Sequence, residues 1–209
     1  MKKGRQDRVR PKQKRSEETR RRIIEAGIRL FSEKGYHSTS SKKIAREAGT
    51  AIGSFYNYFD DKKQLLFEIQ RLHSEKVHAM IEKSLKELFE NSPDMDGRTI
   101  VQRMVDQALD LHSYSPQLHR EITSLTYSDP DFAEMGRKED GRVIEIFLKL
   151  LNQQKDSLRT DDLEAAVMVV GLAMEAVVHT IRIFGSPIDE KRLIDALGDM
   201  IHRFLYKSP

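Results

Sequence analysis

Residues 35–66 read GYHSTSSKKIAREAGTAIGSFYNYFDDKKQLL, and this stretch decides the fold. Its apolar residues recur at helical spacing and predict two short helices, one over 41–48 and one over 52–58. A three-residue turn that begins at Gly49 separates them, and Gly49 can take the positive φ that ends a helix abruptly. Two short helices joined by such a turn are typical of a helix-turn-helix.

The apolar residues of the two predicted helices meet in the angle between them. Ile44 and Phe55 are spaced for this contact, and Ala45 is small where the helices must cross closely. The second helix of a helix-turn-helix enters the DNA major groove. The polar residues on its outer face suit phosphates and base edges, and they are Ser54, Tyr56, Asn57 and Tyr58.

The stretch resembles the DNA-binding domain of the TetR (tetracycline-repressor-like) family of regulators. The family pattern runs from a helix ending in Phe through Gly-aromatic and Thr-Ser to Ile-Ala-x-x-Ala-Gly. It continues with Gly-x-aromatic-Tyr-x-x-Phe and Lys-x-x-Leu, and many matches at fixed spacing are far more specific than one short motif. The matching residues are Leu30-Phe31, Gly35-Tyr36, Thr39-Ser40, Ile44-Ala45, Ala48-Gly49, Gly53, Phe55-Tyr56, Phe59, Lys62 and Leu65.

The chain departs from the family pattern at two places. Family members usually carry Val-Ser after the turn glycine, whereas this chain has Thr50 and Ala51. The usual N-cap hydroxyl of the recognition helix is therefore absent or shifted to Thr50. Ser41 stands where a Val is common, at the edge of the small core.

The resemblance implies which residues contact DNA. Thr39, Ser40 and Lys43 would approach the phosphate backbone at the start of the first short helix, and Lys62 would hold a phosphate. Gly53 would let the backbone lie close to the DNA, where a side chain would push it away. The residues facing the operator would be Thr50, Ser54, Tyr56, Asn57 and Tyr58.

Composition indicates an α-helical protein of the cytoplasm. The chain has no Cys, which excludes a disulfide, a thiolate metal site and a cysteine nucleophile. No uninterrupted apolar run reaches the roughly 18 residues that a membrane span needs. The longest run, around 165–178, is interrupted by Gly171 and Glu175. We expect no cofactor and no membrane contact.

The net charge of +3 hides an asymmetry. Residues 1–22 hold eleven Lys or Arg and three acids, while the rest of the chain holds 25 basic and 30 acidic side chains. A basic arm on a mildly acidic body suits a protein that meets a polyanion with one end. The alternative is a solubilising tail or a vector remnant without a binding role.

The whole pattern predicts an all-α fold in three parts. A basic flexible arm occupies 1–15, a helix-turn-helix domain 16–60, and a helical effector-binding and dimerisation domain 61–209. No alternating run typical of strands is present. Beyond a long helix that ends near residue 91, the apolar segments cover 98–113, 117–127, 130–154, 161–184 and 188–206.

The last two predicted helices indicate a dimer interface. The helix over 161–184 is apolar almost all round, which is typical of a helix buried on two sides. An ordinary monomer core would explain this too. The resemblance implies instead a four-helix interface between two copies, and two-fold DNA half-sites require a two-fold protein. The expected interface residues are Val170, Gly171, Met174, Val178, Leu197, Met200, Ile201 and Phe204.

The resemblance also implies a small-molecule pocket in the region between the helix-turn-helix domain and the two dimer helices. A stripe of apolar residues is the candidate wall, although such a stripe is more often plain core. His112, His119 and His179 are the polar groups of interest there, but no cluster shows metal-ligand spacing, and we expect no metal site. The candidate wall residues are Met104, Tyr114, Leu118, Ile122, Phe132, Phe147, Met168 and Leu172.

These features predict a transcriptional regulator rather than an enzyme. No glycine-rich phosphate loop, Gly-x-Ser-x-Gly elbow or paired-carboxylate motif is present. We expect a homodimeric repressor that binds a palindromic operator on double-stranded DNA and is released by a small hydrophobic effector. The rival is an effector-free DNA-bound interaction protein of the same fold, such as a nucleoid-associated or division-control factor. An effector-binding scaffold without DNA binding is disfavoured by Tyr56, Lys62 and the basic arm.

Overall fold

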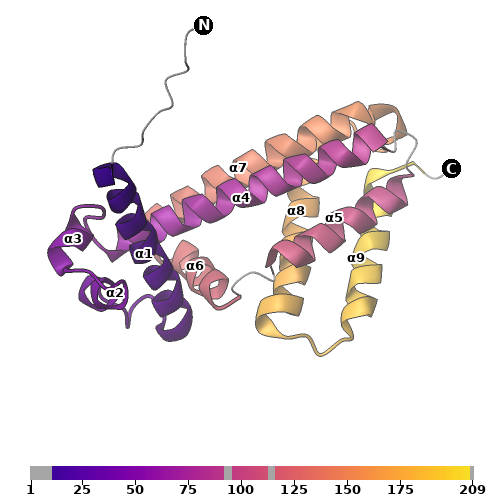
Figure 1. The fold of residues 1–209 in the computed structure, drawn as a ribbon. Helices are drawn as coiled ribbons and strands as arrows, with labels where there is room; N and C mark the ends of the chain where they lie inside the picture. Colours follow the sequence, from indigo (N-terminus) through magenta and orange to yellow (C-terminus); the bar gives the residue numbers. More distant parts are fainter. Residues whose placement is uncertain (1–10, 92–95, 113–115, 208–209) are drawn as a thin grey trace, which may run out of the picture. The chain divides into compact units, whose positions relative to one another are not determined.

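The computed structural model describes residues 11–91, 96–112 and 116–207, and these residues are almost entirely helical (Figure 1). Among them there is no strand, and one isolated antiparallel bridge joins Leu158 and Tyr206. The all-α prediction is confirmed. The chain divides into two compact units, Met1–Leu72 and His73–Pro209.

The first unit contains the helix-turn-helix. Both short helices lie within two residues of their predicted bounds, and Gly49 has a φ of +63° in the turn between them. Ile44 and Phe55 are both fully buried, as their spacing predicted. The helices are α1 (Pro11–Lys34), α2 (Ser41–Glu47), α3 (Ile52–Tyr56) and the first part of α4 (Lys62–Asn91).

The start of α1 corrects one predicted boundary. The basic arm was expected to be flexible over 1–15, but residues 11–15 are the first turns of α1. Proline suits such a start, because the first helical position needs no backbone donor and Pro11 supplies none. Only residues 1–10 of the arm lie outside the described part of the chain.

The first part of α4 also belongs to the first unit, which therefore ends twelve residues later than the sequence suggested. Gly27 of α1 lies so close to α4 that a Cβ there would come within 2.8 Å of the Leu65 side chain. Leu65 and Ile69 are buried against this close crossing. The apolar pattern of α4 runs on without a break, so nothing in it marks where one core ends and the next begins.

The second unit contains one helix for each predicted segment. Three aspartates cap helix starts with their side chains: Asp129 accepts from the backbone N–H of Asp131, Asp162 from that of Ala165, and Asp189 from that of Arg192. The elements are the rest of α4, α5 (Gly97–His112), α6 (Pro116–Ser128), α7 (Pro130–Gln153), a 3-10 turn (Lys155–Ser157), α8 (Leu163–His179), a π-helical turn (Thr180–Phe184) and α9 (Glu190–Leu205).

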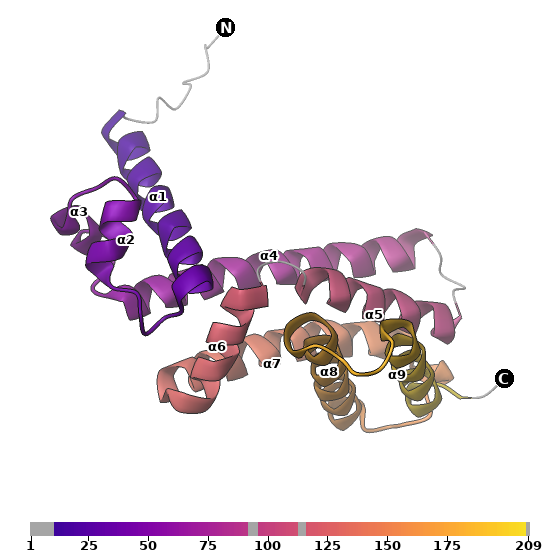
Figure 2. The ribbon, with the colours of Figure 1, turned by 90° about the horizontal axis from the view of Figure 1, so that it is seen from below.

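α8 and α9 lie side by side, and α5 packs against both (Figures 1 and 2). Their contact forms the main apolar core of the second unit, in which Val105, Val178 and Ile201 have no exposed surface. α6 packs on α7, where Phe132 is fully buried. The segment Leu163–Phe184 is long and apolar enough to cross a membrane by length and composition alone. Its inner face, however, is part of this core.

Candidate DNA-binding surface and histidine cluster

α3 presents a polar outer face above a buried aromatic anchor. Phe55 is fully buried against Phe59, with ring centroids 5.9 Å apart, while the neighbouring Tyr56 is 54% exposed. Asn57 is exposed as well. Phe55 packs inward on one side, and Tyr56 and Asn57 face outward on the other.

Tyr58 is tied to α1. Its hydroxyl lies 3.0 Å from the hydroxyl of Ser16, and both side chains remain partly accessible. This bond joins the end of the helix-turn-helix to the first helix. Ser54 and Thr50 are half-buried, and the operator-facing role of all three residues stays a prediction.

Gly53 lies on the exposed face of α3. A Cβ at this position would meet no atom within 4 Å. Folding of the chain therefore does not require glycine here, since a larger residue would fit the protein itself. The absence of a side chain leaves the backbone of α3 open to an outside partner.

The N-terminus of α3 lacks a side-chain cap. Ala51 occupies the N-cap position and can make no such bond. Thr50 does not replace the missing hydroxyl as the cap; its backbone N–H donates to the carbonyl of Ala45 over 3.0 Å. Of the two possibilities left open by the sequence, the N-cap hydroxyl of the recognition helix is therefore absent and not shifted to Thr50.

The structure corrects the predicted phosphate contact of Thr39 and gives Lys62 a structural role, while the phosphate contact of Lys62 stays a prediction. The Thr39 side chain is only 2% exposed, and its hydroxyl donates to the carbonyl of Gly35 over 2.9 Å. The Lys62 ammonium donates to the carbonyls of Tyr36 and Thr39 over 2.7 and 2.8 Å, and it lies 4.2 Å from the centre of the Tyr36 ring. Partial burial lowers the pKa of Lys62. Both side chains hold the loop before α2, and carbonyl partners of this kind leave no trace in a sequence.

Ser40 and Lys43 remain candidates for the phosphate backbone. Ser40 is the N-cap of α2, and its hydroxyl accepts from the backbone N–H of Lys43 over 3.3 Å. The Lys43 ammonium donates to the carbonyl of Ser38 over 2.8 Å. Both residues are exposed.

The predicted dimer residues lie mostly on the wrong face of α8 and α9. The sequence placed Met174 at the interface, yet it is 8% exposed and belongs to the core of its own chain. A helix that is apolar all round has no polar side that would show which of its residues face outward. The same correction applies to Val170, Val178, Leu197 and Ile201.

The exposed apolar residues of these two helices form a separate stripe. Met200 and Phe204 are exposed, as a dimer interface requires, and so is Gly171. Met168 and Leu172 were predicted in the pocket wall, but they are 46% and 60% exposed and belong to this outer face instead. We define the apolar stripe as Ala165, Met168, Val169, Leu172 and Ala176 of α8 with Met200 and Phe204 of α9.

The remaining predicted pocket residues fall into two groups. Met104 is buried in the main core, and Phe147 packs against that core half-buried. Leu118 and Ile122 of α6 and Phe132 of α7 are buried where these two helices pack. Tyr114 lies outside the described residues.

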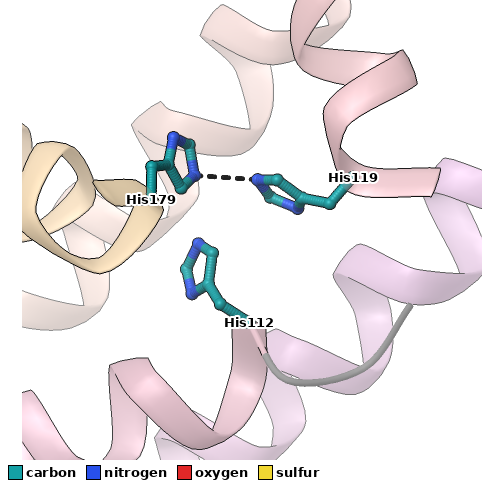
Figure 3. A group of neighbouring side chains, drawn as sticks. All are labelled: His112, His119 and His179. Carbon is teal, nitrogen blue, oxygen red and sulfur yellow. Dashed lines mark hydrogen bonds between the residues drawn. The ribbon is translucent and has the colours of Figure 1, made fainter. Parts of the chain in front are cut away.

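Three histidines come together in the second unit, contrary to the expectation drawn from their spacing. His112 ends α5, His119 lies in the first turns of α6, and His179 ends α8. One nitrogen from each imidazole lies within 4.8 Å of the others, and the three rings face a common centre (Figure 3). The Nε2 atoms of His119 and His179 are 2.8 Å apart. Sequence spacing missed the cluster because three different helices supply it.

The histidine cluster comprises His112, His119 and His179, of which His179 is buried and the other two are half-buried. Burial, and then the neighbouring imidazoles, lower the pKa of His119 to about 3. Burial likewise lowers the pKa of His179 to about 4, and it lowers the pKa of His112. All three rings are therefore neutral at pH 7, and each neutral ring offers one nitrogen lone pair.

Two family models match this chain. Residues 23–69 match the bacterial regulatory proteins of the tetR family. Residues 98–205, about half of the chain, match the tetracyclin repressor-like C-terminal domain. The chain belongs to the TetR family. As a TetR-family member it is a DNA-binding transcriptional regulator and not an enzyme.

Curated TetR-family relatives are similar over part of their length. The HTH-type transcriptional regulator HbdR of Aromatoleum sp. (strain CIB) is 51% identical over 51 residues, which are 24% of this chain and 22% of HbdR. The fatty acid metabolism regulator protein of Bacillus subtilis is 36% identical over 79 residues, 38% of this chain and 39% of that protein. The matched parts thus span less than two thirds of these relatives.

Solved structures of TetR-family regulators share the whole fold. One from Mesorhizobium loti superposes with a TM-score of 0.72 at 21% identity, over 92% of this chain and 99% of that one. A regulator from Saccharomonospora viridis, solved in complex with choline, has a TM-score of 0.69 at 17% identity, over 92% and 100% of the two chains. Both carry the same order of an N-terminal helix-turn-helix and a C-terminal helical domain.

Proposed function

We propose that this chain is a cytoplasmic, dimeric repressor that binds a palindromic operator and is released by a small-molecule effector. The observation that carries the proposal is the outer face of α3. Tyr56 and Asn57 are exposed there beside Gly53, whose missing side chain leaves the backbone open. Polar and aromatic side chains on a rigid recognition helix read base edges and phosphates in the major groove.

The apolar stripe supports the dimer. Leu172, Phe204 and other members of the stripe expose large apolar side chains on α8 and α9, two helices that pack side by side. Exposed apolar surface of this kind marks an interaction site. A second copy of the chain suits it, because a two-fold dimer presents two recognition helices to half-sites about 34–36 Å apart.

Release by an effector would follow from a shift between two dimer states. A ligand that binds one state better than the other shifts the population by its difference in affinity. If the favoured state spaces the recognition helices wrongly for the operator, ligand binding weakens DNA binding. TetR-family regulators bind small-molecule effectors, and one structural neighbour was solved with choline.

The test is operator binding measured by fluorescence anisotropy. Labelled palindromes from the gene's own upstream region are titrated with the protein, and a compound panel is then added. We expect saturable binding by the intact chain and at least about tenfold weaker binding by Tyr56→Ala, about 1.4 kcal/mol. Tyr127→Ala is the matched control, because Tyr127 is an exposed tyrosine on α6 of the second unit.

The outcomes separate the candidate functions. Operator binding that a compound releases supports the proposal. Operator binding that no compound changes favours the effector-free DNA-bound interaction protein. Binding that Tyr56→Ala and Tyr127→Ala affect equally would show that α3 does not read the DNA as proposed.

A further inference from the structure

We propose that His112, His119 and His179 bind a divalent transition-metal ion of the zinc class, and that this ion is an effector of DNA binding. The site itself stands on the geometry of the histidine cluster. The regulatory part rests on the proposed function, because it requires an operator whose affinity can change.

The spacing of the nitrogens fits such an ion after a small adjustment. Zn²⁺ binds imidazole nitrogen at about 2.0–2.1 Å in tetrahedral geometry, which places two such ligands about 3.3 Å apart. The 2.8 Å between the Nε2 atoms of His119 and His179 is shorter than this distance. The nitrogens of the three rings lie up to 4.8 Å from one another, which is longer. Side-chain rotations that move these nitrogens by about 1 Å would bring all three into the coordination range.

His112 is already held in the form that a metal ligand needs. Its Nδ1 lies 2.7 Å from the carbonyl oxygen of Ala108. A carbonyl oxygen only accepts, so Nδ1 carries the proton and the Nε2 of a neutral ring carries the lone pair. Metal-binding histidines characteristically donate their other N–H to a backbone carbonyl in this way, which fixes both the tautomer and the ring orientation.

A carboxylate beside the cluster favours a cation. The Oε1 atom of Glu175 lies 3.6 Å from the Nε2 of His179, the same nitrogen that faces His119. A divalent ion at the three imidazoles would place a positive charge next to this carboxylate, whose side chain is 54% exposed. Glu175 is thus the candidate fourth ligand, and three protein nitrogens with one oxygen complete a tetrahedral site.

The location of the cluster links it to conformation. The ligands come from the ends of α5 and α8 and from the start of α6, and His179 directly precedes the π-helical turn Thr180–Phe184. π-helical turns occur frequently at functional sites. An ion bound to all three imidazoles would fix α6 relative to α5 and α8. Such a bond favours whichever state of the second unit brings the nitrogens together.

A direct titration tests the site. Untagged, metal-free protein is titrated with Zn²⁺ in a calorimeter and with Co²⁺ in a spectrophotometer, where tetrahedral Co²⁺ absorbs visible light strongly. We expect one ion per chain with a dissociation constant below about 1 µM. His119→Gln and His179→Gln should each weaken binding at least about 100-fold. The matched controls are His37→Ala and His202→Ala, which remove histidines far from the cluster in sequence and outside it in the structure.

The same samples test regulation. Operator affinity is measured with and without one equivalent of Zn²⁺, and we expect at least a fivefold change that His119→Gln abolishes, in line with typical coupling between linked sites. Absence of saturable binding, or unchanged binding by both glutamine variants, overturns the metal site. One bound ion with no change in operator affinity overturns its role as an effector. Failure to bind any operator, with zinc still bound at the cluster, overturns the proposed function and leaves the metal site standing.

Discussion

At the scale of single residues, a substitution at Gly53 should change DNA binding without disturbing folding. Gly53→Ala adds a Cβ that meets no atom of the protein within 4 Å. Since alanine favours a helix over glycine by about 0.5–1 kcal/mol, the free energy of unfolding should stay the same or rise by that amount. The added methyl group projects from the open face of α3, so operator affinity should fall at least about tenfold. Urea unfolding and anisotropy measure the two effects.

Gly141→Ala is the matched control for Gly53→Ala. Gly141 lies within α7 of the second unit, and a Cβ there also meets no atom within 4 Å. It should give a similar gain in stability with unchanged operator affinity. If Gly53→Ala bound the operator normally, close approach of the α3 backbone to DNA would be contradicted.

Lys62 has a structural role that its place in the family pattern does not show. Lys62→Met removes the donor to the carbonyls of Tyr36 and Thr39. Loss of hydrogen bonds from a charged donor should lower the free energy of unfolding of the first unit by about 1.5–3 kcal/mol. Hydrogen exchange of the α1–α2 loop measures this loss directly. Lys83→Met, at an exposed lysine of α4, should change stability by less than about 0.5 kcal/mol.

How far single residues could be predicted depends on what holds them. Ile44, Phe55 and Gly49 were predicted because local periodicity and backbone conformation fix their roles. The buried Thr39 hydroxyl was not, because its carbonyl partners leave no mark in the side-chain pattern. The histidine cluster was missed for a related reason, since its members lie on three helices and only the tertiary fold brings them together.

At the scale of elements, helix positions follow from the sequence but helix faces do not always. The predicted segment 161–184 is α8 with its π-helical turn, and 188–206 is α9 within two residues at each end. The polar residues of α9 mark its exposed side, yet Leu197 and Ile201 were predicted at the interface and lie in the core. α8 has too few polar residues to mark an exposed side. Val170, Met174 and Val178, which were predicted at the interface, are buried in the core, while Met168 and Leu172, which were predicted in the pocket wall, are exposed. Caps fix where such a helix begins, while tertiary packing fixes how it is rotated.

The exposed apolar residues of α8 lead to a specific prediction about dimerisation. Leu172→Glu changes a side chain that is 60% exposed, so the fold of the single chain should be kept. In a dimer through the apolar stripe, the same charge would be buried unpaired at a cost of several kcal/mol. Sedimentation velocity should show a monomer, while circular dichroism shows normal helicity. Met80→Glu, at an exposed methionine of α4, should remain dimeric.

Met174→Glu should behave differently from Leu172→Glu, although the two residues are close in sequence. Met174 is 8% exposed and belongs to the core of its own chain. Its replacement should unfold the second unit or cause aggregation instead of giving a folded monomer. A Leu172→Glu protein that sediments as a dimer would place the interface on another surface.

At the scale of the whole molecule, basic charge is concentrated at the N-terminal end of the sequence, where we expect contact with DNA. Residues 2–10 hold five Lys or Arg and one Asp, whereas the chain after residue 22 has more acidic than basic side chains. Each phosphate contact contributes about −0.9 to the slope of log K against log[salt]. Removal of residues 2–10 should therefore weaken operator binding and flatten the slope by up to about 4.5 units, because at most five basic side chains are lost.

Replacing those five basic residues by Gln tests whether charge alone is responsible. This variant keeps the length of the arm and should flatten the salt dependence as much as the deletion does. The described part of the chain supports cutting at residue 10, because α1 begins at Pro11 and a longer deletion would remove helical turns. Loss of those turns would weaken binding through the fold and not through phosphate contacts. An unchanged slope in both variants would show that the DNA is held by the helix-turn-helix alone, with the arm as a solubilising tail.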